Sequence, residues 1–139
     1  MEETIQSSRE WLEYARRDWQ AANHLTTAEP ELYKIICYHC EQAIEKVLKG
    51  FLVFHEVDFP RTHDLVELCK LCINIDLRFH EIAEDCSELT GYGTQMRYPS
   101  GIEVDEAEMK EALAACGVIM DFVEDSLDFE QEQGPQMSM

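Results

Sequence analysis

The sequence is poor in basic residues, with 11 lysines and arginines against 29 aspartates and glutamates, and its formal net charge is -18. Charge of this sign repels polyanions, so we expect no extended binding to nucleic acid, and a basic protein partner is favoured instead. The chain also lacks a run of about 18 apolar residues, and its start lacks the basic and apolar segments of a secretory signal. We therefore expect a cytoplasmic protein that does not associate with a membrane.

The motifs of several enzyme classes are also missing. The sequence has no glycine-rich phosphate loop, no Gly-x-Ser-x-Gly turn around a nucleophilic serine and no His-Glu-x-x-His pair for zinc. No segment reads as a strand, and there is no internal repeat. At 139 residues the chain has the size of one domain, and we expect an all-α fold.

Apolar residues recur at helical spacing in five segments, which end near Thr26, Phe54, Asn74, Leu89 and Leu127. The predicted starts are a capping box of Ser7 and Glu10, Pro30 in a first turn, Thr62 and Asp76 as N-caps, and a capping box of Asp105 and Glu108. The second segment is the longest and most apolar, so we expect it at the centre. Residues 1–127 would form the helical domain, and the acidic residues 128–139 a disordered tail.

Six cysteines include two Cys-x-x-Cys pairs, a spacing that is typical of zinc sites. Both pairs lie inside apolar helical patterns, where cysteine serves as a small core residue. We therefore predict reduced thiols and no cofactor, and we keep a thiol metal-binding module as an alternative. The two pairs are Cys37 with Cys40 and Cys69 with Cys72, and the other cysteines are Cys86 and Cys116.

The second segment also carries Glu45 and Lys49, four residues apart. Opposite charges at this spacing support a helix by roughly a few tenths of a kcal/mol. We interpret this pair, with the neighbouring Lys46, as part of a solvated helix face.

An irregular segment with one arginine, Tyr92–Gly101, interrupts the helical pattern, and Arg97 is its centre. Its guanidinium can offer a planar fork to a phosphate or a carboxylate, while Tyr92 and Tyr98 can stack on a base. The alternative is an ion pair between Arg97 and one of the many acidic residues of the chain.

A second candidate is His63, which follows Arg61 at a predicted helix start. Backbone N–H groups and the arginine would create a small positive patch there. The simpler alternative is a capping turn with an exposed imidazole.

Three segments carry a resemblance when they are taken together and in order: Tyr38-His39-Cys40-Glu41-Gln42-Ala43-Ile44-Glu45-Lys46-Val47-Leu48-Lys49-Gly50, Thr62-His63-Asp64-Leu65 and Arg97-Tyr98-Pro99. With Trp11-Leu12 and residues 15–18, they resemble the HEPN domain family over residues 8–125. The resemblance implies an up-and-down bundle of four long helices with one additional short helix, usually assembled as a homodimer. It also implies a role related to nucleotides, because prokaryotic members commonly act with a small nucleotidyltransferase, often as a toxin–antitoxin pair.

Catalytic members of that family are metal-independent ribonucleases, in which a histidine follows the arginine after four to six residues. Here those positions hold Ile102, Glu103 and Val104. None of them can replace an imidazole, and Glu103 would repel a phosphate. The sequence therefore keeps the phosphate-binding half of the pair and lacks the half that transfers protons.

We therefore predict a HEPN-like binding or accessory module, without catalytic residues, that dimerises and engages a nucleotide or a nucleotidyltransferase partner. The first alternative is a metal-independent ribonuclease that uses Arg97 with a non-standard acid or base such as His63, and the second is the thiol metal-binding module. The predicted nucleotide-binding residues are Arg97, Tyr98, Tyr92, His63 and Arg61.

Overall fold

The computed structural model describes residues 2–92 and 103–127, and every regular element in these ranges is helical. Three helices are long: α1 (Glu2–His24), α2 (Tyr33–Phe54) and α6 (Glu106–Ser126). The others are the helices α3 (Leu65–Ile75) and α4 (Ala83–Leu89) and the 3₁₀ helices η1 (Leu25–Thr27) and η2 (Leu77–Ile82). The predicted all-α bundle is thus confirmed, and the predicted count of four long helices is approximate.

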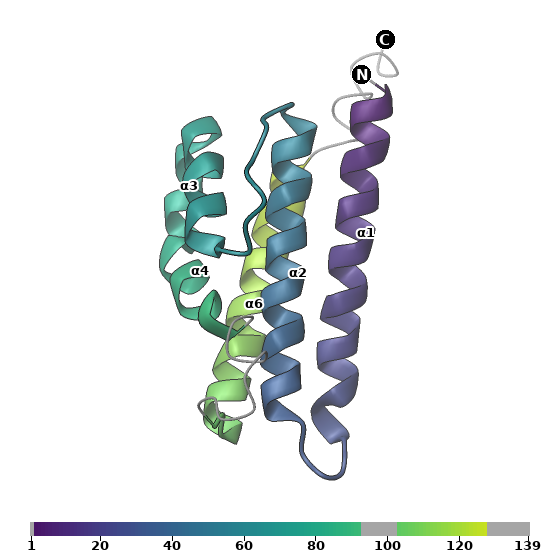
Figure 1. Cartoon of the computed structure of the whole chain (residues 1–139), viewed down its shortest axis with the longest axis vertical. Coiled ribbons are helices and arrows are strands. Elements are labelled where there is room, and N and C mark those ends of the chain that lie inside the picture. Colours follow the sequence, from purple (N-terminus) through teal and green to yellow (C-terminus); the bar gives the residue numbers. More distant parts are fainter. Residues whose placement is uncertain (1, 93–102, 128–139) are drawn as a thin grey trace.

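Helix α2 lies at the centre of the bundle and packs against α1, α3, α4 and α6 (Figure 1). Its predicted apolar stripe is fully or almost fully buried at every position, which confirms the helical spacing. The ring of Phe51 on this helix contacts the ring of Phe79 of η2 at a tilt, and Phe79 in turn contacts Phe122 of α6. The buried stripe consists of Ile36, Cys40, Ala43, Val47 and Phe51.

Two predicted helix starts, those of α1 and α2, are wrong by three residues or more. Helix α1 begins at Glu2, and the acidic residues of its first turn stabilise the positive end of the helix dipole. Ser7 therefore lies inside the helix and does not cap it. Helix α2 begins at Tyr33, since the Leu32 carbonyl accepts its first N–H bond from Ile36, and Pro30 belongs to the preceding loop.

The observed caps of the other three elements lie at or near their predicted positions. Asp105 and Glu108 form the predicted capping box, with Asp105 Oδ1 2.8 Å from the Glu108 backbone nitrogen. Asp76 accepts from the Arg78 N–H as predicted, although the element it caps is the 3₁₀ helix η2. The predicted N-cap Thr62 of α3 is wrong by two residues. The cap is Asp64, which accepts from the Val66 N–H, whereas the Thr62 hydroxyl oxygen accepts from the Asp64 N–H before the helix begins.

No helix in the described ranges is long and apolar enough to cross a membrane. The predicted tail, residues 128–139, lies outside these ranges.

Candidate functional site

A buried ion pair on α2 is the centre of the polar site. Lys49 Nζ lies 3.0 Å from Glu45 Oε2, and the two side chains are only 10% and 6% exposed. Lys49 also lies against two aromatic rings, 5.8 Å from the centroid of Trp11 and 5.6 Å from that of Phe59. The prediction of a solvated face is therefore wrong at this pair, because α1 and the loop before α3 cover it. Two charges that are removed from water need compensating contacts such as this ion pair and these aromatic rings.

His63 completes this cluster from the loop before α3. Its Nδ1 atom lies 2.7 Å from Glu45 Oε1, so the carboxylate of Glu45 holds a lysine with one oxygen and a histidine with the other. Because a carboxylate only accepts hydrogen bonds, Nδ1 carries the proton in this contact. The His63 side chain is 60% exposed, which leaves the ring accessible from solvent. The Glu45 contact therefore orients the imidazole, as a general acid or base requires.

A second polar cluster joins α1 to α2. The carboxylate of Asp18 on α1 contacts His39 Nδ1 at 2.9 Å with one oxygen and Lys46 Nζ with the other. All three side chains are largely buried, so the prediction of a solvated face is wrong at Lys46 as well. The arrangement repeats the pattern of the first cluster, with one carboxylate between a histidine and a lysine.

Tyr92 follows α4 and is half-buried. It shares a side-chain hydrogen bond with Cys37 of α2, and burial, with the nearby Cys37 and Glu108, raises the pKa of Tyr92 to about 12. Cys37 precedes Glu45 by eight residues, so the contacts of Tyr92 and His63 lie about 12 Å apart along α2. Arg61 is exposed in the same loop as His63. Arg97 and Tyr98 lie outside the described residues.

The cysteines do not gather into one site. All six are buried, and among the described residues no group of three or more His, Cys, Asp or Glu side chains could hold a metal ion. The thiol of Cys72 donates to the Leu48 carbonyl, and that of Cys116 to the Cys40 carbonyl. Burial raises the pKa of Cys37 to about 12.

Sequence reasoning missed the second cluster and a further acid. Asp18 and His39 lie 21 residues apart on different helices, so no local pattern joins them. Asp18 and His39 do lie in segments that carry the family resemblance, and this resemblance is the sequence signal that could have pointed to them. Glu41, on the same helix, is fully buried and accepts a hydrogen bond of 2.8 Å from the Gln42 side chain.

Comparisons with known proteins agree with the resemblance. The model of the HEPN domain family matches residues 8–126. The crystal structure of TT1696 from Thermus thermophilus is similar with a TM-score of 0.70 and 26% identity, over 86% of this chain and 98% of that chain. The crystal structure of ST0689, an archaeal HEPN homologue, gives a TM-score of 0.66 and 21% identity over 86% and 96%, which supports the fold alone. No curated protein matches the sequence.

Proposed function

The chain belongs to the HEPN domain family, and from this premise we propose that it is a non-catalytic module that binds a nucleotide or a nucleotidyltransferase partner. The observation that carries the proposal is the identity of the residues after Arg97. The positions at which catalytic members would hold a histidine are Ile102, Glu103 and Val104. In the structure Glu103 is exposed and Val104 packs against the core, and neither carries the imidazole that those members use.

The proposed ligand site combines one cation with aromatic rings. The Arg97 guanidinium would bind a phosphate through two parallel N–H bonds, and the rings of Tyr98 and Tyr92 would contact a base. From the loop before α3, Arg61 would add positive charge and His63 an exposed imidazole. Tyr92 would contribute its ring, because its hydroxyl group already bonds to Cys37.

Calorimetric titration of the full chain with ATP and GTP tests the ligand. We expect Arg97→Ala to weaken binding by about tenfold or more, because a charge-assisted bidentate contact is lost. Arg78→Ala is the matched control, since this arginine is exposed and pairs with Asp76 at the start of η2. Equal affinities of wild type and Arg97→Ala would remove Arg97 from the site.

The partner needs a separate experiment. A nucleotidyltransferase expressed together with this chain should co-purify with it, and light scattering should show whether the complex contains two copies of the chain. A nucleotidyltransferase that never co-purifies, while ATP or GTP binds, would limit the proposal to the nucleotide.

A metal-independent ribonuclease is the second candidate, and the contact between His63 and Glu45 favours it. An imidazole held by a buried carboxylate can remove a proton from a ribose 2′-hydroxyl, whose oxygen then attacks the adjacent phosphorus as the bond to the 5′-oxygen breaks. Arg97 would stabilise the charge on the phosphate oxygens, and the 5′-oxygen would take up a proton.

RNA cleavage in the presence of a chelator tests this candidate. Activity should fall by about a hundredfold or more in His63→Ala, as expected for the loss of a general acid or base. His24→Ala is the matched control, because His24 is exposed at the end of α1. Cleavage that survives His63→Ala excludes His63, and no cleavage by wild type excludes this enzyme class.

A further inference from the structure

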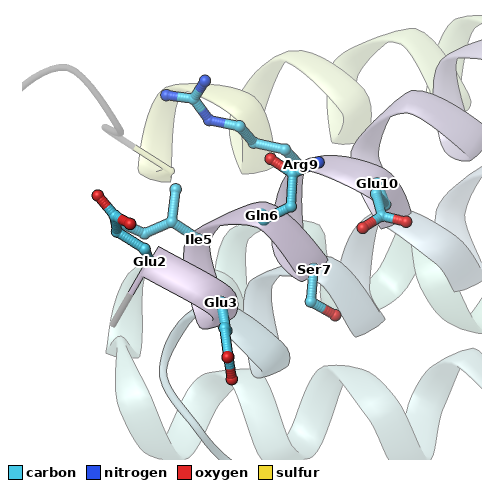
Figure 2. A pocket seen from close by; sticks show the side chains of 7 residues that line it. All are labelled: Glu2, Glu3, Ile5, Gln6, Ser7, Arg9 and Glu10. Atoms are coloured by element: carbon cyan, nitrogen blue, oxygen red, sulfur yellow. The ribbon is translucent and has the colours of Figure 1, made fainter.

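A groove follows the outer side of α1 and reaches α2. Its inner part is a cavity of about 330 Å³ lined by Ser7, Glu10, Trp11, Tyr14 and Lys46. A wider cavity of about 620 Å³ shares Ser7 and Glu10 with it and continues to the start of α1 (Figure 2). The shared residues make the two cavities one continuous surface, which we call the α1 groove.

The inner part of the α1 groove has aromatic walls. Tyr14 is 53% exposed, a high value for a large ring, and Trp11 is half-buried and forms a T-shaped contact with Phe59. Aromatic faces attract cations through the ring quadrupole. Both rings already do so within the chain: the Arg17 guanidinium lies 5.1 Å from the Tyr14 centroid, and Lys49 Nζ 5.8 Å from that of Trp11.

Carboxylates border the α1 groove. Figure 2 shows Glu3, Ser7 and Glu10 on one side of α1, whereas the side chain of Arg9, which also lines the wider cavity, extends in the opposite direction. Lys46 lines the inner cavity, but its ammonium group forms a salt bridge with Asp18, which offsets its charge. The lining thus holds the carboxylates of Glu2, Glu3 and Glu10 against Arg9 and the paired Lys46. Together with the net charge of -18 on the chain, this balance favours cations over phosphates in the groove.

We propose that the α1 groove is the docking site for a basic segment of a partner protein. An arginine of that segment stacks on Tyr14 and Trp11 and pairs with Glu10. Arginine suits the site better than lysine, because its planar guanidinium can stack on a ring and bind a carboxylate at the same time. The inference goes beyond the proposed nucleotide site and does not depend on it, since Tyr92, His63 and Arg61, the described residues of that site, do not line the groove.

The probe is a synthetic peptide of Arg-Ala repeats, and its counterpart with citrulline in place of arginine keeps the shape without the charge. Trp19→Phe leaves Trp11 as the only tryptophan, so the fluorescence of Trp11 reports binding to the full chain. We expect the arginine peptide to quench Trp11 and the citrulline peptide to leave it unchanged. In this background Tyr14→Ala and Glu10→Gln should each weaken binding by about threefold to tenfold.

Glu67→Gln on α3 is the matched control for Glu10→Gln, because it removes the same charge from an exposed site on the other side of α2 (Figure 1). The affinity of Glu67→Gln for the arginine peptide should stay within about twofold of that of the Trp19→Phe protein, since screening weakens distant surface charges. An equal loss of peptide affinity in Tyr14→Ala, Glu10→Gln and Glu67→Gln would mean unspecific attraction to an acidic surface and would overturn the proposal. Quenching by the citrulline peptide, or displacement of the arginine peptide by ATP, would overturn it as well. Tyr14 and Glu10 are exposed, so both variants should fold, which circular dichroism checks.

Discussion

Ser8 Oγ on α1 donates a hydrogen bond of 2.7 Å to the carbonyl oxygen of Gly50 on α2. Ser8 is fully buried, and a Cβ atom built on Gly50 would lie 3.1 Å from Trp11 Cβ and 3.4 Å from the Ser8 carbonyl oxygen. The two helices therefore approach each other closely at this point. This approach keeps Trp11 beside Lys49, so it positions the polar site as well as the core.

Substitution of Gly50 by alanine should destabilise the protein, although alanine favours a helix by about 1 kcal/mol over glycine. The new methyl group would meet atoms next to the backbone of α1, which cannot move alone, and overpacking costs about 1–3 kcal/mol. Chemical denaturation measures the free energy of unfolding.

Gly117→Ala is the control within α6. The atoms nearest to its added Cβ are the ring carbons of Trp19 at 3.3 Å, and this half-buried ring can shift. We expect a change between zero and a gain of about 1 kcal/mol. The same loss at both glycines would contradict the close-approach argument.

The buried pair of Glu45 and Lys49 gives a second prediction. Lys49→Ala leaves the carboxylate of Glu45 in a nearly dry site with one partner fewer, and we expect a loss of about 3–5 kcal/mol in unfolding free energy. The exposed pair Glu106 and Lys110 has the same spacing, with side chains 59% and 68% exposed. Lys110→Ala should cost less than about 0.5 kcal/mol. Two equally small losses would show that Glu45 is well solvated.

The residues of α2 also show how much of the fold can be predicted from the sequence. The spacing of apolar residues predicted the buried stripe of α2, because a helix repeats its faces with a fixed period. The same reasoning assigned Glu45 and Lys49 to solvent, since charged residues usually lie there. Which side of α2 the neighbouring helices cover depends on contacts distant in sequence, such as that of Lys49 with Trp11.

Contacts between residues distant in sequence also limited how much of the site could be predicted. His63 was chosen for its place near a helix start, and the structure adds its contact with Glu45, 18 residues earlier. The start of α1 was misplaced because a capping box is a local motif, which cannot reveal that the neighbouring Ser8 binds α2. Arg97 and Tyr98, outside the described residues, remain predictions.

The buried thiols give a third prediction. A protonated thiol is a poor nucleophile, and burial raises the pKa of Cys37 to about 12 and also raises that of Cys72. Ellman's reagent should therefore find almost no reactive thiol in the native protein near neutral pH and all six in denaturant. A hydrogen bond with Cys86 lowers the pKa of Cys69, so a single thiol that reacts natively should be Cys69.

A zinc-sensitive dye in the same experiment tests the alternative of a thiol metal-binding module. Metal released as the thiols react in denaturant would support that alternative. Native reaction of several thiols would instead contradict the buried core.

Tyr92 gives a prediction for alkaline pH. An unfolded tyrosine has a pKa of about 10, whereas burial raises the pKa of Tyr92 to about 12 in the folded protein. Above pH 10 the unfolded chain therefore loses this proton first, which favours unfolding. The contribution of Tyr92 to stability is fully present below about pH 10 and declines as the pH rises to about 12.

The variant Tyr92→Phe should show a shallower fall of unfolding free energy between pH 10 and 12 than wild type. At neutral pH it should be less stable by about 0.5–1.5 kcal/mol, because the hydrogen bond with Cys37 is lost. The difference between the tyrosinate absorbance of the two folded proteins reports Tyr92 directly, and its midpoint should lie near pH 12. A midpoint near pH 10 would show that the Tyr92 hydroxyl is in contact with water, and that this group is free to bind a ligand.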